Sequence, residues 1–366
     1  MLSTILSIIY LILILGVLVF VHEFGHFIAA KKIGVYVSEF AIGMGPKIYS
    51  FKRKKKNDPT EYSIRLLPIG GFCAMAGEVI EDDDSKKIKK NEYMCNRSKW
   101  ERFLILIAGV TMNIITAFIL LFAQSLIWGH TEQKSVVGNV PAGYPVAEAG
   151  IEVGDTIQKV NGYKVNTWDK MTLIMSLKND KGYTEFEVKK QDGTIKTYKV
   201  TPVTKINEDG TETKVYGIGA SSEEIRGFFS SIKYAFVKLG SIVSTMLLII
   251  LNLIKGKLSL SALSGPVGMY TVVKSAGTFR QLLYLTSYLS INLAVINAIP
   301  FPAFDGGRIL FVVIEAIKGS KVKPEVENTF HSIGFMLLML LINSCFRLYY
   351  MHFVIIIKLS NPRSYI

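Results

Sequence analysis

Long runs of apolar residues alternate with polar and charged stretches along the chain. The first run, Leu2 to Val21, contains no charged side chain and is followed by Lys31 and Lys32. It is longer than the apolar core of a signal peptide, and no small-residue cleavage site follows it. About 20 apolar residues cross a bilayer, and basic residues mark the cytoplasmic end. We therefore predict a transmembrane helix in residues 1–30 whose N-terminus lies outside the cell.

Three later apolar runs predict further spans, in residues 101–128, 282–317 and 330–350. The first of these is flanked by Trp100 and Trp128, and tryptophan is typical of membrane interfaces. The second is interrupted by prolines and a Gly-Gly pair. Because broken backbone at membrane depth is tolerated only where protein buries it or where it lines a cavity, this interruption indicates a functional site.

The run from Phe228 to Ile254 is ambiguous, because Lys233 and Lys238 interrupt its first half while its second half is strongly apolar. If it crossed the membrane, the next basic loop, Lys318 to Lys323, would lie outside the cell. Cytoplasmic loops carry the excess of Lys and Arg. We therefore expect residues 223–256 to form an amphipathic helix in the outer interface, with a spanning helix as the alternative.

Residues 129–222 are hydrophilic, and about 90 residues suffice for a small domain with its own core. Strand-like patterns occur at Val136–Val140, Thr156–Val160 and Tyr183–Val188, and a helical pattern occurs at Trp168–Leu177. This α/β domain follows the second span, so we expect it outside the cell.

The loop of residues 31–100 is basic and is expected in the cytoplasm. Within it, Glu61–Leu67 alternates as a strand does, Pro68–Phe72 is typical of a turn, and Glu81–Lys90 is typical of a charged surface. A hairpin that dips toward the membrane would offer open strand edges to an extended substrate. A solvated cytoplasmic hairpin is the alternative.

The pattern as a whole predicts a polytopic α-helical membrane protein with four transmembrane helices, a membrane-reentrant β-hairpin and one inserted extracytoplasmic α/β domain. In chain order, the expected segments are the first transmembrane helix (1–30), the loop with the hairpin (31–100), the second transmembrane helix (101–128), the α/β domain (129–222), the interfacial helix (223–256), a connecting segment (257–281), the broken third transmembrane helix (282–317), a cytoplasmic loop (318–329), the fourth transmembrane helix (330–350) and a tail (351–366).

Composition agrees with a membrane protein, since 50% of the 366 residues are hydrophobic and the mean hydropathy is +0.34. The formal net charge of +13 would suit nucleic acid, but much of the excess lies in the loop of residues 31–100, and no recognised nucleic-acid-binding fold accompanies it. We therefore expect no nucleic-acid partner. Cys73, Cys95 and Cys345 have neither zinc-knuckle spacing nor the pattern of a disulfide framework.

The end of the first apolar run carries the sequence His22-Glu23-Phe24-Gly25-His26. Residues i and i+4 of a helix share a face, so His22 and His26 can bind one metal ion, and Glu23 can take a proton from a bound water. Ionisable groups in membrane spans are usually functional. Asp305 lies at the break of the third span, where a turn-forming role is the alternative. The pattern predicts a zinc site within the bilayer.

These features resemble the site-2 proteases, which are intramembrane zinc metalloproteases, and in particular the bacterial branch with the regulator-of-sigma-E protease. The likeness covers nearly the whole chain. Its motifs are His22-Glu23-Phe24-Gly25-His26 for HExxH, Phe301-Pro302-Ala303-Phe304-Asp305-Gly306-Gly307 for PxPxLDGG with Asn297 before it, Arg65-Leu66-Leu67-Pro68-Ile69-Gly70-Gly71 for the reentrant hairpin, Leu263-Ser264-Gly265-Pro266-Val267-Gly268 before the third helix, and Gly143 to Ile151, Gly154-Asp155 and Val160-Asn161-Gly162 for one PDZ domain.

A single PDZ domain is more like the Gram-positive members of this family. Two residues depart from its pattern: Phe304 replaces the commoner leucine, and Val110 replaces a common proline after the glycine of the second helix. Both differences should affect packing and not ligation.

The resemblance implies that His22, His26 and Asp305 bind Zn²⁺ and that Glu23 is the catalytic base. It also implies substrate-binding roles for Asn113, Asn292, Asn297, Gly70 and Gly71. Taken from the residues alone, Asn113 and the Gly109 one turn before it are as well explained by helix packing and an interhelical hydrogen bond.

The implied activity is that of a zinc metalloendopeptidase that cuts single-span membrane proteins within the bilayer, after a first cleavage outside the membrane. Anti-sigma factors and signal-peptide remnants are examples of such substrates. The implied location is the bacterial plasma membrane, with the active site near the cytoplasmic side. The PDZ domain, on the outer side, would exclude large external domains or contact a peptide or carboxylate.

Two other functions are considered. A PDZ-bearing scaffold with a vestigial metal site would be favoured by loss of a ligand or of Glu23, and none is lost. A zinc or ion transporter would suit ionisable residues in spans. The zinc-protease spacing with an intact base favours hydrolysis.

Overall fold

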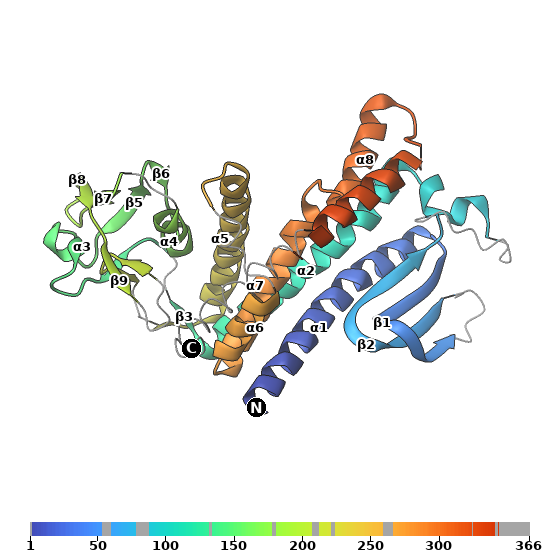
Figure 1. Ribbon diagram of the computed structural model, residues 1–366, viewed down its shortest axis with the longest axis horizontal. Coiled ribbons are helices and arrows are strands. Elements are labelled where there is room, and N and C mark those ends of the chain that lie inside the picture. Colours follow the sequence, from blue (N-terminus) through green and yellow to red (C-terminus); the bar gives the residue numbers. More distant parts are fainter. Residues whose placement is uncertain are drawn as a thin grey trace, which may run out of the picture. The chain divides into compact units, whose positions relative to one another are not determined.

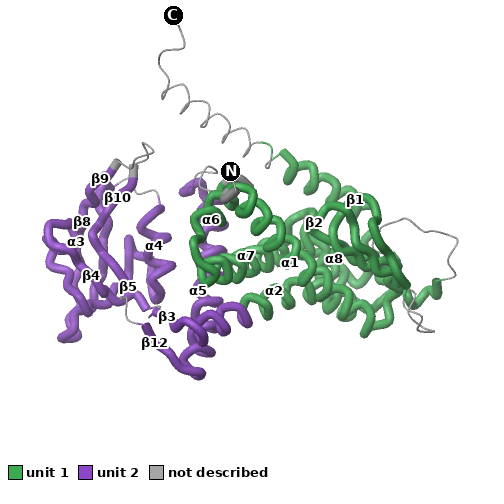
Figure 2. The backbone as a smooth tube through the Cα atoms, turned by 90° about the horizontal axis from the view of Figure 1, so that it is seen from below, with its two compact units in different colours: residues 1–117, 260–366 green, residues 118–259 purple. Residues whose placement is uncertain are grey.

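The computed structural model describes residues 2–52, 60–77, 88–131, 134–177, 181–206, 212–220, 224–258, 266–323, 325–340 and 343. Cys345, the tail 351–366, most of Glu81–Lys90 and the first residues of Leu263–Gly268 lie outside this described part. The chain forms two compact units, residues 1–117 with 260–366 (unit 1) and residues 118–259 (unit 2), coloured separately in Figure 2.

Unit 1 consists of long helices and a β-hairpin (Figure 1). Its helices are α1 (Leu2–Ile33), the first part of α2 (Lys99–Trp128), α6 (Pro266–Ser275), α7 (Phe279–Ala298), α8 (Asp305–Lys318), helical residues 325–340, and the short 3₁₀ helices η1 (Lys90–Glu92) and η2 (Met94–Asn96). The turn between α7 and α8 contains Pro300 and Pro302, which have no backbone N–H to continue a helix.

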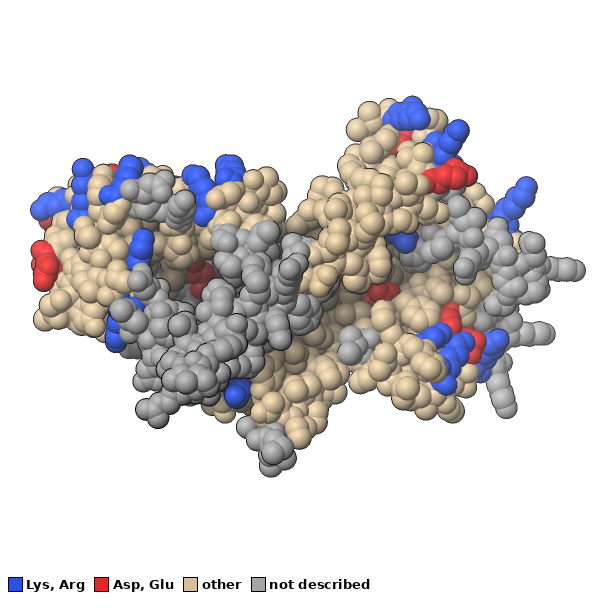
Figure 3. Space-filling view, in the orientation of Figure 1, with Lys and Arg blue, Asp and Glu red and all other residues tan. Residues whose placement is uncertain are grey.

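Three helices in the described part of the chain are long and apolar enough to cross a membrane: Thr4–Ile33 within α1, Lys99–Trp128 and Phe228–Ile254. In Figure 3 the helices of unit 1 are covered mostly by uncharged side chains, and charged side chains gather near α8 and the hairpin. Both observations fit a multi-pass membrane protein. The count of four spans and the interfacial position of Phe228–Ile254 stay predictions.

Helix α1 packs closely against α2 on one side and against the hairpin on another. A Cβ atom added to Gly25 would lie 2.4 Å from the carbonyl oxygen of Ala108, so only glycine allows the two backbones to approach this closely. On another side of α1, Phe24 and Phe27 pack on Phe40 of the hairpin, with ring centroids 6.3 and 4.8 Å apart. These aromatic contacts belong to a buried core that joins α1, α2, the hairpin and α8.

The hairpin is formed by β1 (Val37–Lys52) and β2 (Glu61–Met75), and each strand pairs twice because both are bent. The register places four segments side by side, in the order 71–75, 37–42, 61–64 and 47–52. The expectation of a turn at Pro68–Phe72 is wrong: this stretch is part of β2, and Phe72 pairs with Ala41. Gly70 has φ +82°, a conformation that bends the strand without reversing it.

Charged residues on the hairpin neutralise one another. Glu39 accepts hydrogen bonds from Ser63 at 2.5 Å and from Arg65 at 2.8 Å, and Lys47 bridges Glu39 and Glu61 at 3.2 and 3.1 Å. Burial raises the pKa of Glu39, but the hydrogen bonds from Ser63, Arg65 and Lys47 outweigh this effect and hold the pKa below its usual value. The rest of the hairpin surface exposes large apolar side chains, among them Ile48, Tyr49 and Leu66.

Unit 2 contains a four-stranded antiparallel sheet with the order β6-β5-β7-β8. Its other pairs are β3 with β12, β4 with β11 and β9 with β10. The elements are β3 (His130–Thr131), β4 (Val137–Asn139), α3 (Pro145–Glu148), β5 (Thr156–Val160), β6 (Tyr163–Lys164), α4 (Trp168–Ser176), β7 (Thr184–Lys189), β8 (Ile195–Val200), β9 (Val203–Ile206), β10 (Glu212–Val215), β11 (Gly219–Ala220), β12 (Glu224–Ile225) and α5 (Phe228–Ile254). Phe186, Ile157 and Met171 are fully buried in its core.

Helix α5 turns its polar side toward the small domain of unit 2. Lys238 is buried and donates to both carboxylate oxygens of Asp169, at 2.9 and 2.8 Å, and Ser241 donates to Thr167, the N-cap residue of α4. Large apolar residues lie on its exposed side, for example Phe229 and Ile254, at 82% and 78% exposure. The helix is therefore amphipathic, with its polar side used inside the protein.

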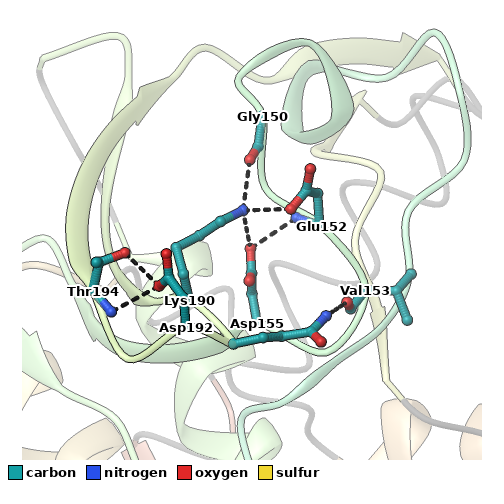
Figure 4. A network of polar contacts seen from close by, with 8 residues as sticks. Gly150, Glu152, Val153, Asp155, Lys190, Asp192 and Thr194 are labelled. Carbon is teal, nitrogen blue, oxygen red and sulfur yellow. Dashed lines mark hydrogen bonds and ion pairs between the residues drawn. The ribbon is translucent and has the colours of Figure 1, made fainter.

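A polar network ties two loops of unit 2 together (Figure 4). Lys190 donates to the carbonyl oxygen of Gly150 and to the carboxylates of Glu152 and Asp155, at 3.1, 2.8 and 2.9 Å. Its hydrogen bonds to Glu152 and Asp155 raise the pKa of Lys190 above its usual value. The turn after β7 is thereby held against the loop that precedes β5.

Candidate metal centre

Helix α1 brings the side chains of His22 and His26 onto one face, one turn apart. Both are buried, with ring centroids 4.8 Å apart, and their Nε2 atoms are separated by 3.2 Å. Two imidazole nitrogens this close either share one proton or, when neither is protonated, can face one cation.

Asp305, the first residue of α8, completes the cluster. Its Oδ2 lies 2.9 Å from His22 Nε2 and 3.3 Å from His26 Nε2, but forms no hydrogen bond of acceptable angle and is buried. In a tetrahedral site with bonds of ~2.0–2.1 Å, ligand atoms lie about 3.3 Å apart. Three donor atoms separated by 2.9, 3.2 and 3.3 Å, two imidazole and one carboxylate, therefore fit a catalytic zinc ion that keeps its fourth position open.

The second nitrogen of each histidine is held by α2. His26 Nδ1 lies 2.8 Å from the backbone carbonyl oxygen of Ile105, to which it donates, leaving Nε2 without a proton and able to bind metal. His22 Nδ1 lies 3.3 Å from the amide of Asn113.

The amide orientation of Asn113 follows from the same argument. As placed, its nitrogen faces His22 and its Oδ1 is buried with no hydrogen-bond partner. Because His22 Nδ1 carries the proton when Nε2 binds metal, we assign the amide the other way round, so that Oδ1 accepts this proton. The backbone oxygen of Asn113 accepts from Ser290 of α7 at 2.8 Å.

Gly109 provides the space into which the two imidazoles fit. A Cβ atom at this position would lie 2.5 Å from His26 Nε2 and 2.8 Å from His22 Cε1. Any other residue would displace the rings. The geometry of the candidate metal centre therefore depends on Gly109 of α2 as well as on the two histidines of α1.

Glu23 is half-buried and contacts the hairpin. Its Oε2 accepts the backbone N–H of Cys73 at 3.1 Å. Cys73 lies in segment 71–75, at the edge of the hairpin sheet, and this edge is therefore next to the candidate base.

The other residues implied by the resemblance lie on the same unit. Asn292 and Asn297 are on α7, and because they are five residues apart they point about 140° apart around the helix. The side-chain oxygen of Asn292 is buried with no hydrogen-bond partner in the described part of the chain. Gly70 and Gly71 are buried in β2, where Gly71 pairs with Ile42 of β1.

Sequence reasoning did not anticipate three contacts at this centre. These are the direct contact of Asn113 with His22, the N–H of Cys73 on Glu23, and the contact of His331 with the turn before Asp305. The helical spacing of Gly109 and Asn113 was a signal for the first, whereas the other two join segments far apart in the chain.

Comparison with known proteins agrees with this chemistry. The model of Peptidase family M50 matches residues 10–341. The chain is 32% identical to a protein named zinc metalloprotease RasP of Bacillus licheniformis, with 92% of this chain and 96% of that protein covered. It is 30% identical to the regulator of sigma-W protease RasP of Bacillus subtilis, again with 92% and 96% covered. This chain therefore belongs to Peptidase family M50 and is a zinc metalloprotease that is itself a multi-pass membrane protein.

Proposed function

We propose that this protease hydrolyses peptide bonds within the transmembrane segments of single-span membrane proteins. The observation that carries the proposal is the position of the donor atoms. His22 and His26 lie inside α1, which is long and apolar enough to cross a bilayer, and Asp305 Oδ2 lies 2.9 Å from His22 Nε2. A site built into a spanning helix meets substrates that are themselves in the membrane.

In this proposal, His22, His26 and Asp305 hold the zinc ion, and Glu23 is the general base. Bound zinc supplies Lewis-acid chemistry that lowers the pKa of water toward about 7 and polarises the scissile carbonyl. Glu23 accepts a proton from the water that attacks the carbonyl carbon, and then gives it to the amine nitrogen as the C–N bond breaks. The N–H of Cys73, 3.1 Å from Glu23, orients this carboxylate.

The edge segment 71–75 suits capture of an extended substrate. A substrate helix keeps its carbonyl groups in internal hydrogen bonds, so it must unwind before attack, and an open strand edge can take over those bonds. Gly70 and Gly71 add no side chain at the start of this segment. Asn113, Asn292 and Asn297 are the side chains proposed to contact the substrate backbone, and the unpartnered oxygen of Asn292 supports its part.

Unit 2 is proposed to contain a PDZ domain outside the cytoplasm. A cavity of about 370 Å³ beside α4 supports contact with a peptide or its carboxylate, since it is lined by Met175 of α4 and by Gly217, Ile218 and Gly219. The domain would exclude substrates with large external parts, so that a first cleavage outside the membrane precedes this one. The name of the Bacillus subtilis relative favours an anti-sigma factor as one substrate, beside signal-peptide remnants.

The test is the substitution Glu23→Gln, assayed with purified protein in liposomes that contain a single-span substrate. Zinc content should stay stoichiometric, because Glu23 is not a proposed ligand. Cleavage should fall by about 10²–10⁴, the usual effect of losing a general base. Glu325→Gln, on an exposed carboxylate of another helix, is the matched control. Full cleavage by Glu23→Gln would refute the role of Glu23 as general base. If the wild-type protein cut only soluble peptides, the proposal of cleavage within transmembrane segments would fail.

A further inference from the structure

The helix of residues 325–340 packs against the turn that precedes Asp305. We propose that His331 and Gly334 of this helix form a seat for the turn and act as positioning residues for the metal site. The proposal rests on the proposed function in one respect, because it takes Asp305 to be a zinc ligand. His331 and Gly334 are three residues apart, so they lie on the same face of their helix.

The turn has a conformation that needs support. Ala303, two residues before Asp305, has φ +77°, in the left-handed region that residues with a side chain rarely adopt. Such strain persists only where the surroundings hold the backbone in place. The N–H of Ala303 donates to His331 Nδ1 at 3.1 Å.

The choice of histidine at this position has a physical reason. Since Nδ1 accepts a hydrogen bond, Nε2 carries the proton, and Nε2 is buried with no hydrogen-bond partner in the described part of the chain. A buried N–H without an acceptor destabilises a protein, so packing alone would favour a leucine over a histidine at position 331. The contact that a leucine could not make is the one to Ala303.

The imidazole is oriented by two phenylalanines. Phe330 meets it edge to face, with ring planes at 90° and centroids 5.8 Å apart, and Phe311 of α8 lies at 6.2 Å. The ring is thus fixed between its own helix and α8. His331 Nδ1 therefore presents its lone pair at a defined place.

Gly334 brings the backbone of the turn against the helix. A Cβ atom at Gly334 would lie 1.9 Å from Pro302 Cβ and 2.7 Å from Pro302 Cα, a clash that no side-chain rotation relieves. From the other side, a Cβ atom on Gly307 would lie 2.5 Å from the carbonyl oxygen of Phe301 and 3.2 Å from His331 Cε1. The turn therefore fits closely between α8 and the helix of residues 325–340.

The seat acts on the metal site through the backbone. Asp305 begins α8 directly after the turn, and its Oδ2 must lie near the Nε2 atoms of His22 and His26. A shift of a fraction of an ångström in the turn moves this oxygen by a similar amount. Contacts one step removed from a metal ligand commonly change metal affinity by about 10–100-fold.

The first experiment measures zinc affinity by competition with a chelator, with metal content read by mass spectrometry. His331→Leu keeps the volume and removes the acceptor, so zinc should bind at least tenfold more weakly. His331→Asn keeps an acceptor near the position of Nδ1 and should bind zinc within a factor of about three of the wild type. Phe335→Leu, an exposed position on the same helix, is the control. Wild-type affinity in His331→Leu, or equal losses in both His331 variants, would overturn the proposal.

The second experiment needs no metal. Hydrogen exchange of metal-free protein is followed at the Ala303 amide, which should exchange at least tenfold faster in His331→Leu than in His331→Asn or the wild type. Gly334→Ala should do the same, while Gly240→Ala, where an added Cβ meets nothing within 4 Å, should not. Unchanged exchange in Gly334→Ala and His331→Leu would overturn the seat.

The two experiments separate this proposal from the proposed function. If zinc binding proves independent of Asp305 while Ala303 exchange changes as expected, the ligand assignment fails and the seat stands. If His331→Leu does not fold, Gly334→Ala alters the same contact from the facing residue and decides the question.

Discussion

Asp305 Oδ2 lies within 3.3 Å of His22 Nε2 and His26 Nε2 without a well-angled hydrogen bond to either, so the three atoms suit a shared cation. The separations match those of ligands around one tetrahedral ion. Ile105 and Asn113 each hold the remaining nitrogen of one histidine. The centre is thus arranged before any ion binds, which lowers the cost of ordering the ligands.

The Asn113 side chain gives a prediction at this scale. Asn113→Leu removes the acceptor for His22 Nδ1–H, so zinc affinity should fall by about 10–100-fold in a chelator competition. Asn292→Leu is the contrasting variant: it should leave zinc affinity unchanged and raise KM for the substrate, because Asn292 is proposed to contact substrate alone. Equal zinc affinity in both variants would assign Asn113 to the substrate.

Single residues also show how far a sequence can predict such a site. His22, Glu23 and His26 were predictable because a helix converts a spacing of four into one face. Asp305 was a candidate because it lies at the break of an apolar span, and the resemblance to a family implied its role as a zinc ligand. The contacts of Cys73 and His331 depend on packing between segments 50 and 28 residues apart, and no pattern within either segment encodes them.

The crossing of α1 and α2 gives a prediction at the scale of elements. Gly109→Ala adds a Cβ atom 2.5 Å from His26 Nε2, so the imidazoles must move and zinc should be lost. Gly240→Ala makes the same change in α5 with no contact within 4 Å and should bind zinc normally. Both proteins are compared for zinc content and for folding by circular dichroism. Stoichiometric zinc in Gly109→Ala would mean that the helices are not packed as closely as described.

The ion pair between α4 and α5 gives a second prediction at the scale of elements. Lys238 is buried against the half-buried carboxylate of Asp169, so Lys238→Met leaves Asp169 without its main cation. Breaking such a pair from one side destabilises by about 3 kcal/mol. Thermolysin should therefore cut unit 2 of the full-length protein faster in Lys238→Met than in the wild type. Lys233→Met, on the exposed side of α5, is the matched control, and equal rates in the two variants would contradict this role.

The positions of helices and strands along the chain were predicted better than the pairing of the strands. The sequence predicted strands and a helix in unit 2 close to β4, β5, β7 and α4, because their periodicity is local. The double pairing of β1 with β2 could not be predicted, since alternation within a strand does not show which segment it pairs with, and the bends at Gly43 and Gly70 let each strand pair twice. The turn expected at Pro68–Phe72 was wrong for this reason.

At the scale of the whole molecule, the boundary between the two units falls within the apolar helix α2, between residues 117 and 118. Unit 2 takes in the hydrophilic domain together with α5, whose polar side binds that domain through Lys238 and Ser241. Such a helix can satisfy its lysine inside the protein and present Phe229 and Ile254 to lipid. Its length suits a span, whereas its polar side suits the interface, so the helix alone does not determine the topology.

Topology is therefore the prediction that decides between these positions for α5. In a variant with Cys73, Cys95 and Cys345 replaced by serine, a cysteine introduced at Lys196 in β8 should react with a membrane-impermeant maleimide added to intact cells. A cysteine at Lys323, in the basic loop after α8, should react only after the membrane is permeabilised. Labelling of both sites from outside would mean that α5 spans the membrane. Protection of Lys196 in intact cells would place unit 2 in the cytoplasm, and a PDZ domain there could not select substrates by their external parts.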